Sequence, residues 1–201
     1  MKERVVISFL TKNRHKFNEA KEALMPYHCI QIDQLCEEKH ENKDDSSSDP
    51  IKLIALRAAV EGANLHNKIV VAEDTGLFFN AYYDFPSLNT KWVIKRLGYE
   101  GILRLLNDKD RSAYFRCVVA LCYPNKEPIV FEGRIDGYIA EKVYGENIDC
   151  MDYDRIFIPY GSDVPFSLMM DNKIHTSHRT IAFQRLGEYL SKQMDKTLDN
   201  G

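Results

Sequence analysis

The stretch VVAEDTGLFF, residues 70–79, decides the fold, because an apolar, β-branched run leads into two adjacent carboxylates, Glu73 and Asp74. A run rich in valine predicts a buried strand, and the Thr75 and Gly76 that follow are typical of a turn. Buried carboxylates without partners cost several kcal/mol, so this pair needs a metal, a cation or water. The stretch therefore predicts either an exposed turn or a ligand site at the end of a central strand.

Strand-like and helix-like patterns alternate on both sides of this stretch. The expected strands cover residues 4–10, 29–33, 68–72, 113–123, 128–133 and 135–143, the last three joined by short turns. The expected helices cover residues 13–25, 50–65, 87–106 and about 177–194. This order predicts an α/β fold in which strand-loop-helix units precede a set of consecutive strands.

Length and composition restrict the class of protein. The 201 residues, 44% of them hydrophobic, suit a single domain over 1–201, with a polar loop at 37–50 that is expected to be mobile. The 27 basic and 30 acidic residues leave a net charge of -3, which disfavours a nucleic acid polymer as partner. No apolar stretch approaches the ~18 residues of a membrane span, so we expect a cytoplasmic protein without a membrane partner.

Cysteine usage argues against two further classes. The five cysteines form no CxxC pair and leave an odd count, which disfavours a disulfide framework and a zinc site. Cys117 and Cys122, in the apolar run CVVALC, are interpreted as small core residues.

The stretch TKNRHK, residues 11–16, follows the first expected strand and opens the first helix. Backbone amides at a helix N-terminus, together with Lys16, would face a bound anion such as a phosphate. The alternative is a helix cap at Asn13 or Thr11 followed by solvated basic residues, and these six residues alone favour it.

The stretch KIHTSHRTIAF, residues 173–183, gathers Lys173, His178 and Arg179 at the start of the last expected helix. Positive side chains oppose the helix dipole there, and a bound anion or electron-rich ligand would offset that cost. The alternative is an N-cap at Ser177 with charged side chains in solvent. Because ligands of α/β domains collect at the carboxyl ends of strands, the three stretches together favour a site for Mg²⁺ and a nucleoside triphosphate.

Several further motifs, in order, resemble the inosine triphosphate pyrophosphatase family, also called the Ham1 or non-canonical purine NTP pyrophosphatase family. They are FLTKNRHKFNEAKEAL, VVAEDTGLFFNA, SLNTKWVIKRLGYEGILRLL, FEGRIDGYIAE, YDRIFIPYG and TSHRTIAF, which cover nearly the whole chain. The second and third are closer to the family's eukaryotic branch. The resemblance implies an elongated α/β fold with a central mixed sheet flanked by helices, two lobes, a ligand cleft between them, and a homodimer.

The same resemblance assigns the phosphate and metal ligands. Thr11, Asn13 and Lys16 match a triphosphate-binding loop, in which Lys12 stands where the family has glycine. Asp74 matches a carboxylate that binds Mg²⁺ and helps to activate water. The remaining assignments are Glu37 or Glu38 as an upstream metal ligand, Glu73 as a metal ligand or its support, and Thr75 near the phosphates. Mn²⁺ is expected to be able to replace Mg²⁺.

The remaining assignments concern added positive charge and the base. Arg57 and Lys91 match positions that add positive charge to the cleft, and Lys173, Ser177, His178 and Arg179 match a segment that recognises a 6-oxo purine. Donors from lysine and arginine suit a 6-keto oxygen and reject a 6-amino group.

This chain departs from the family at the base end. Met151, Asp152, Tyr153, Asp154 and Arg155 replace the usual Phe-Gly-Trp/Tyr-Asp-Pro, so Met151 stands where an aromatic ring stacks on the purine. The thioether of Met151 and the ring of Tyr153 are expected to cover the base instead, with Asp154 nearby. VPFSLMM, residues 164–170, replaces the family's Thr-x-Ala-Glu segment.

The sequence thus predicts an Mg²⁺-dependent hydrolase that converts ITP, dITP and XTP to the monophosphate and pyrophosphate and so cleanses the nucleotide pool. Asp74 and Lys16 are its expected catalytic residues. Two alternatives stay open. One is a Maf-like or otherwise altered-specificity nucleotide pyrophosphatase, and the other is a nucleotide-binding protein that has lost turnover.

Overall fold

A computed structural model of the chain describes residues 4–37, 47–83, 85–169 and 176–199, with side chains of the last helix described to residue 196. The chain divides into two compact units. Unit 1 comprises Met1–Asp74, Cys117–Gly133 and Arg179–Gly201, and unit 2 comprises Thr75–Arg116 and Arg134–His178. Each unit is made of segments that are distant in sequence.

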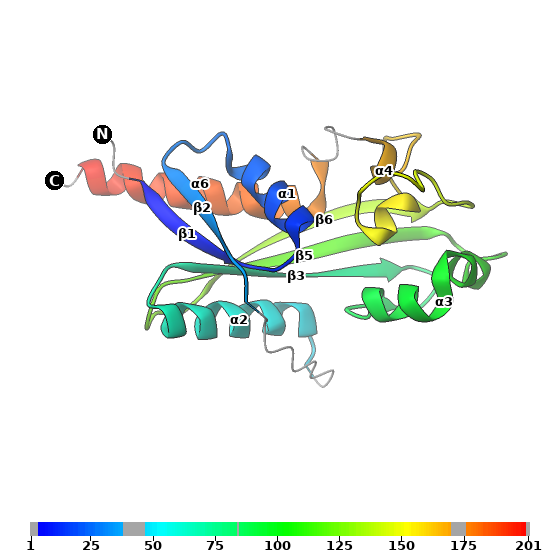
Figure 1. Ribbon diagram of the computed structural model, residues 1–201, viewed down its shortest axis with the longest axis horizontal. Coiled ribbons are helices and arrows are strands. Elements are labelled where there is room, and N and C mark those ends of the chain that lie inside the picture. The colour runs from blue at the N-terminus through cyan, green and yellow to red at the C-terminus, as the bar shows by residue number, and fades with distance from the viewer. Residues whose placement is uncertain (1–3, 38–46, 84, 170–175, 200–201) are drawn as a thin grey trace. The chain divides into compact units, whose positions relative to one another are not determined.

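A mixed sheet of seven strands contains the order β2-β1-β3-β5-β6-β7, with β4 paired to β3 (Figure 1). The strands are β1 (Val5–Leu10), β2 (Ile30–Leu35), β3 (Val70–Phe79), β4 (Pro86–Ser87), β5 (Ser112–Cys122), β6 (Ile129–Ile139) and β7 (Phe157–Pro159). β1 runs parallel to β2 and β3, whereas β3 with β4 and β6 with β7 are antiparallel. The predicted α/β fold with a mixed sheet is confirmed.

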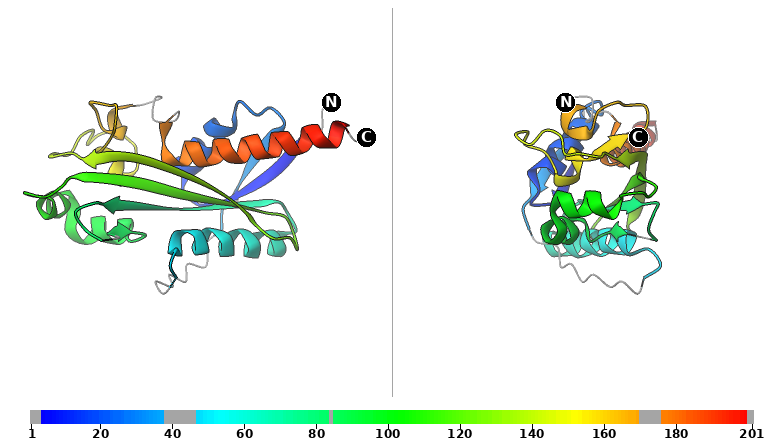
Figure 2. Two further views of the ribbon diagram at one scale, coloured as in Figure 1. Left: turned by 180° about the vertical axis from the view of Figure 1, so that it is seen from behind. Right: turned by 90° about the vertical axis from the view of Figure 1, so that its right-hand side faces the viewer.

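The helices are α1 (Arg14–Leu24), α2 (Pro50–His66), α3 (Thr90–Leu105), α4 (Phe166–Met169) and α6 (His178–Asp199), with a 3-10 turn η1 (Asp152–Arg155). In unit 1, α1 and α6 lie on one face of the strands and α2 lies on the other (Figures 1 and 2). Asp49 caps α2 by accepting a hydrogen bond from the Lys52 amide, and Pro50 occupies the first turn, where no amide donor is needed.

Each unit has its own hydrophobic core. In unit 1, apolar residues of α1 and α6 pack against β1, β3 and β5, including the buried rings of Phe9 and Phe183, whose centroids lie 5.1 Å apart. In unit 2, residues of α3 and α4 pack with β3, β5 and β7, including Phe115, Phe157 and Phe166. Cys117 and Cys122 are fully buried, as predicted, and none of the five cysteines, all of them among the described residues, forms a disulfide.

The prediction that a strand ends at residue 72 is wrong. β3 continues to Phe79, so Glu73, Asp74 and Thr75 lie inside a strand and the alternative of an exposed turn at Asp74 is also wrong. Turn propensity suggested a stop, but the apolar pattern resumes at Leu77, and packing and partners for the carboxylates override local preference.

Three other boundaries also differ from the predictions. Residues 128–133 and 135–143 were expected to form two strands, but a single strand, β6, covers Ile129–Ile139. The helix expected over 87–106 begins at Thr90 and is interrupted at Gly98, whose φ of 62° is non-helical. The last helix begins one residue after the expected start and extends to Asp199, five residues beyond the expected end, because its amphipathic pattern gave no stop signal.

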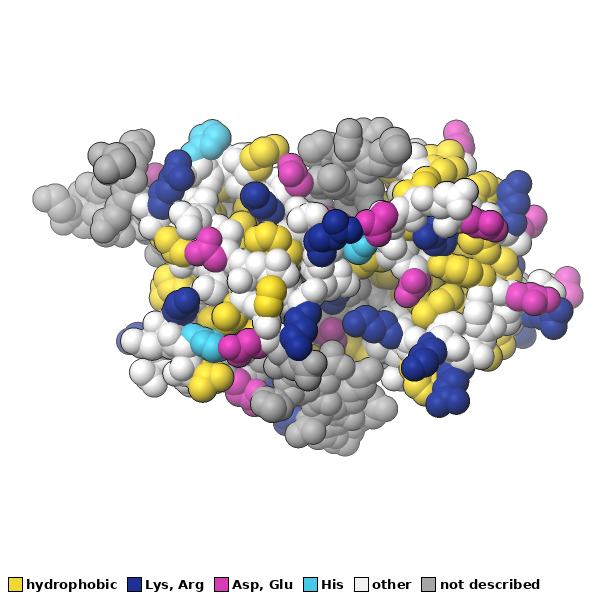
Figure 3. All heavy atoms as spheres, in the orientation of Figure 1, with side chains coloured by type: hydrophobic (Ala, Val, Ile, Leu, Met, Phe, Trp, Pro, Cys, Tyr) yellow, Lys and Arg dark blue, Asp and Glu magenta, His cyan; other side chains and the backbone are white. Residues whose placement is uncertain are grey.

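Among the described helices, none is long and apolar enough to cross a membrane. On the face seen in Figure 3, Lys and Arg side chains are interspersed with Asp and Glu, which agrees with the nearly balanced composition.

We predict that Gly137→Ala destabilises unit 2. Gly137 pairs with Pro159 in the β6–β7 ladder, and a Cβ atom there would lie 2.2 Å from the carbonyl oxygen of Ile158. Forcing the strands apart should lower the free energy of unfolding by about 2 kcal/mol or more, measured by urea denaturation. The control Glu141→Ala changes an exposed side chain of the same unit, and equal unfolding midpoints for the two variants would contradict this close approach.

Candidate active site

The loop between β1 and α1 positions Lys16. Asn13 caps α1, because its Oδ1 accepts hydrogen bonds from the amides of His15 (2.9 Å) and Lys16 (3.3 Å). Thr11 is buried, and its Oγ1 accepts a bond from the Asn13 amide at 3.2 Å. The capping interpretation of Asn13 is therefore confirmed, and it accounts for the orientation of the first helical turn that carries Lys16.

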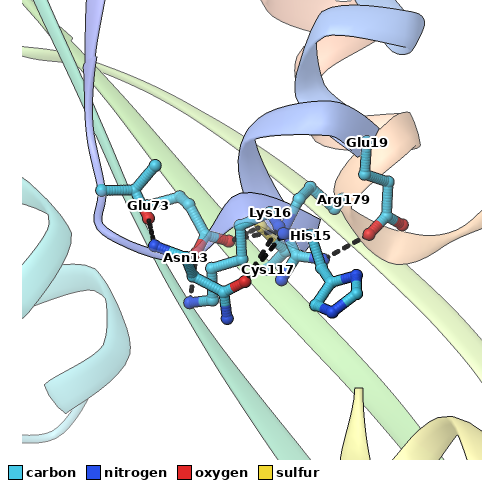
Figure 4. A network of polar contacts seen from close by, with 8 residues as sticks. Asn13, His15, Lys16, Glu19, Glu73, Cys117 and Arg179 are labelled. Carbon is cyan, nitrogen blue, oxygen red and sulfur yellow. Dashed lines mark hydrogen bonds and ion pairs between the residues drawn. The ribbon is translucent and has the colours of Figure 1, made fainter. Parts of the chain in front are cut away.

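Glu73 is the centre of a buried polar network in unit 1 (Figure 4). Its side chain is fully buried in β3, and its Oε1 forms an ion pair with Lys16 Nζ. Its Oε2 accepts hydrogen bonds from Arg179 Nε at 3.1 Å and from Cys117 Sγ at 3.1 Å. A single carboxylate thus joins β3 to side chains of α1, α6 and β5.

Arg179 extends the network to a second carboxylate. It lies in the first turn of α6 with 1% of its side chain exposed, and its Nη1 donates to Glu19 Oε2 at 2.6 Å. Glu19, Glu73 and Arg179 are thus buried, Lys16 is 17% exposed, and each buried carboxylate is balanced by a cation. Such balance is the condition under which buried ions are tolerated, because an unpaired one costs several kcal/mol.

The ionisation of the two cations follows from this burial and pairing. Burial is the largest single influence on the pKa of Lys16 and lowers it, but the charges of Glu73 and Asp74 and the hydrogen bond to Glu73 together raise the pKa above its ordinary value. For Arg179 also, burial opposes the charge, while Glu73 and Glu19 raise its pKa further. Both side chains are therefore cations at neutral pH.

Asp74 lies next to the network. It is half-buried at the end of the β3 segment that belongs to unit 1, and its charge contributes to the raised pKa of Lys16. Because side chains alternate along a strand, Asp74 points to the opposite side of β3 from Glu73. Thr75 follows as a half-buried residue of unit 2. Of the two predicted catalytic residues, Asp74 thus acts on Lys16 through its charge.

The upstream carboxylates are less closely linked to this group. Glu37 Oε2 lies 2.9 Å from His66 Nε2 at the end of α2, and Glu38 lies outside the described residues. Arg57 is exposed on α2 and Lys91 is exposed on α3. Within the described ranges, no three His, Cys, Asp or Glu side chains form a cluster able to hold a metal ion.

The residues in and next to η1 that the sequence predicts to recognise the base belong to unit 2. Met151 is half-buried and its amide donates to Asp154 Oδ2 at 3.2 Å. Tyr153, by contrast, is buried in the core, and its hydroxyl donates to the Thr90 carbonyl at 3.1 Å. Burial raises the pKa of Tyr153, which keeps the phenol neutral. Its ring therefore supports the segment by packing, while Met151 is more accessible.

His178 is held by an aromatic contact in unit 2. Its ring stacks on that of Phe115 with centroids 4.6 Å apart and an angle of 11°, and Ser177 beside it is fully buried. The N-cap alternative, in which charged side chains of this segment point to solvent, is wrong for His178 and Arg179, each 1% exposed. Lys173 lies outside the described residues.

Sequence reasoning missed three residues that hold this site together, namely Glu19, Cys117 and Phe115. Glu19 follows Lys16 by three residues, so both lie on one face of α1, and this spacing was a usable signal. Phe115 and Cys117 are alternate, buried positions of β5, as is Ala113, and nothing in that pattern distinguishes them from ordinary core residues.

A parallel strand-loop-helix unit that presents a lysine beside a carboxylate-bearing strand is the arrangement expected of an α/β protein that handles phosphates. The Ham1 family model matches residues 7–189. The chain belongs to the Ham1 family.

Two archaeal relatives and two solved structures show the extent of the similarity. The chain is 37% identical to the dITP/XTP pyrophosphatase of Methanopyrus kandleri (91% of this chain, 95% of the relative) and 35% identical to that of Saccharolobus solfataricus (96% and 97%). The Staphylococcus aureus Ham1 protein has a TM-score of 0.70 at 26% identity, covering 94% of this chain and 99% of that one. A dITP/XTP pyrophosphatase from Mycobacterium abscessus has a TM-score of 0.62 at 25% sequence identity, covering 98% of this chain and 100% of that one. Since these curated relatives are archaeal, the predicted eukaryotic branch is not confirmed.

We predict that Glu19→Gln destabilises the protein by about 3 kcal/mol, because it breaks a buried ion pair and leaves Arg179 to share the carboxylate of Glu73 with Lys16. Urea denaturation would measure the loss. Glu22→Gln, an exposed change one turn away on α1, is the matched control and should leave the free energy of unfolding unchanged. A loss in Glu19→Gln no larger than in this control would contradict a stabilising role for the network.

We also predict a stability loss in alkali that depends on Lys16. Its pKa is raised in the folded protein from 10.5, so the folded state retains the proton longer than the unfolded state does. The stabilisation is therefore complete below about pH 10.5 and is lost as the pH rises through the folded pKa. Between pH 9 and 12, the free energy of unfolding should fall more steeply in the wild type than in Lys16→Met. The exposed Lys21→Met should follow the wild type, and parallel curves for all three would contradict the prediction.

Proposed function

We propose that the chain hydrolyses the non-canonical purine nucleoside triphosphates dITP, XTP and ITP to the monophosphate and pyrophosphate. The proposal rests on the named activity of curated relatives that align over more than nine tenths of the chain. The structural observation that supports it is the placement of Lys16 at the start of α1, paired with Glu73 and within the electrostatic influence of Asp74. A cation that can neutralise phosphate charge and a carboxylate that can act on water suit attack at a phosphate.

A divalent metal fits the residues present. Mg²⁺ is usually held by one or two carboxylates together with substrate phosphates, so the lack of a three-ligand cluster among the described residues is compatible with it. Asp74 is the proposed ligand, with Glu37 as the second, and Mn²⁺ is an expected substitute. Glu73 suits a role in supporting the metal site rather than binding the metal, because its Oε1 is paired with Lys16 and its Oε2 accepts a hydrogen bond from Arg179. When bound, the metal supplies charge neutralisation at the phosphates and lowers the pKa of water.

The residues of unit 1 divide the reaction between them. Water attacks the α-phosphorus, the bond between that phosphorus and the bridging oxygen breaks, and pyrophosphate leaves. Asp74 is suited to orient the water and to accept its proton, and Lys16 is suited to stabilise charge on the leaving pyrophosphate. The Thr11–Asn13 loop holds Lys16 in place through the Asn13 cap, which reduces the reorganisation needed on binding.

Recognition of the base is assigned to His178, Arg179, Lys173 and Met151. The stack on Phe115 keeps the His178 ring fixed, and the ion pairs of Arg179 fix its guanidinium. Arg179 is 1% exposed and donates to Glu73 and Glu19, so its proposed part is to fix the position of His178 beside it rather than to donate to the base. Donors that suit a 6-oxo purine reject a 6-amino purine. Met151, half-buried beside η1, is suited to cover a purine face through its thioether. Homodimer formation and a cytoplasmic location remain part of the proposal.

We predict that Asp74→Asn abolishes Mg²⁺-dependent pyrophosphate release, lowering kcat about 100-fold or more, because the amide is neither a proton acceptor nor a good Mg²⁺ ligand. The measurement is pyrophosphate release from dITP, XTP, ITP, GTP, ATP, dUTP and CTP, with and without Mg²⁺. Asp33→Asn, an exposed carboxylate on β2, is the control and should behave as the wild type.

The panel also separates the alternatives. Release that favours dITP, XTP and ITP supports the proposed substrates, whereas release from another base indicates altered specificity. A wild type that binds these nucleotides without hydrolysing them would contradict the proposed reaction and identify a binding protein.

A further inference from the structure

Cys117 is a buried thiol of β5 that the proposed reaction does not use. It is fully buried in unit 1, and its Sγ donates a hydrogen bond to Glu73 Oε2 at 3.1 Å (Figure 4). A buried cysteine ordinarily behaves as a small apolar side chain. Cys122, in the same strand, donates to two backbone carbonyls, those of Tyr123 and Lys126. Cys117 differs from Cys122 because it donates to a side-chain carboxylate.

The geometry explains what this thiol adds. A glutamate side chain has three rotatable bonds, so its two oxygens need several fixed donors to keep one orientation. Oε2 of Glu73 accepts from Arg179 and Cys117, and this leaves Oε1 directed at Lys16. The donors come from α6, β5 and α1, three segments that are far apart in sequence. The thiol of Cys117 therefore contributes to the direction in which Glu73 holds the ammonium group of Lys16.

The charge of the network explains why a neutral donor suits this position. Glu73 is already paired with Lys16 and Arg179, and Glu19 is already paired with Arg179. A third cation at residue 117 would leave an excess charge in a buried site, whereas a thiol donates without adding charge. A weak neutral donor can orient the carboxylate without disturbing this balance.

We propose that Cys117 is a positioning residue for pyrophosphate binding, acting through Glu73 on Lys16. This inference rests on the proposed function, in which Lys16 binds the leaving pyrophosphate. Cys117 itself touches no substrate. Loss of its hydrogen bond lets the Glu73 carboxylate rotate, so that Lys16 no longer occupies a single position.

The experiment measures the Kd of inorganic pyrophosphate by calorimetry and kcat/KM for dITP with Mg²⁺. Cys117→Ala should weaken pyrophosphate binding and lower kcat/KM, each about tenfold, because a hydrogen bond to a charged group is lost. Cys117→Ser keeps a donor and should remain within about threefold of the wild type. Cys122→Ala makes an equivalent truncation in the same buried strand and should leave both quantities unchanged.

A double-mutant cycle separates positioning from general damage to the fold. In a Lys16→Met background, Cys117→Ala should cause no further loss of pyrophosphate affinity, because the group through which it acts is gone. An equal loss in both backgrounds overturns the proposal, and so does a Cys122→Ala variant as impaired as Cys117→Ala. The Kd of pyrophosphate can be measured without turnover, so it can also be obtained for variants with low activity.

Failure of the proposed function and failure of this inference give different results. A wild type that releases no pyrophosphate from dITP, XTP or ITP overturns the proposed function and the inference together. A wild type that is active, with pyrophosphate binding unaffected in Cys117→Ala, overturns the inference alone.

Discussion

The burial of one carboxylate, Glu73, is the constraint on which the site depends. A charge in the middle of a strand is tolerated only when opposite charges reach it, and here they come from Lys16 and Arg179. Lys16 is the third residue of α1 and Arg179 is the second residue of α6. The requirement to neutralise Glu73 therefore constrains where these two helices begin relative to β3 within unit 1. Stability and the placement of the predicted phosphate ligand thus have one physical cause.

In the proposed reaction, the network also prepares Lys16 for an anionic ligand. A lysine buried alone loses its charge because burial lowers its pKa, but Glu73 and Asp74 reverse that effect here. The ammonium group therefore stays charged in a largely dry environment, where its interaction with phosphate is stronger than it would be in water. The same carboxylate that stabilises the cation competes for it, so the arrangement suits transient binding of a product that must leave.

The sequence predicted the elements with strong periodicity and missed those decided by tertiary contacts. The helices at α1 and α2 and the strand β5 were located to within one or two residues, because their apolar patterns are local. The extension of β3 through Glu73 was missed, because the partners that make it possible lie 57 and 106 residues away in sequence. Cys117 was correctly assigned to the core, but its role as a donor to that carboxylate depends on a contact that no local pattern encodes.

Departures from the family pattern are distributed unevenly between the two units, and this has a consequence for function. Thr11, Asn13, Lys16 and Asp74 match the pattern and belong to unit 1, where the exposed Lys12 is the one substitution found in the phosphate loop. The changes at 151–155 belong to unit 2, where local contacts absorb them: the Arg155 guanidinium donates to the carbonyls of Gly145 and Ile148, and Tyr153 fills the core. Because the two sets of residues belong to separate cores, changes at the base end need not disturb the buried ion pairs. Under the proposed function, a change at Met151 would therefore alter the choice of base more than the phosphate chemistry.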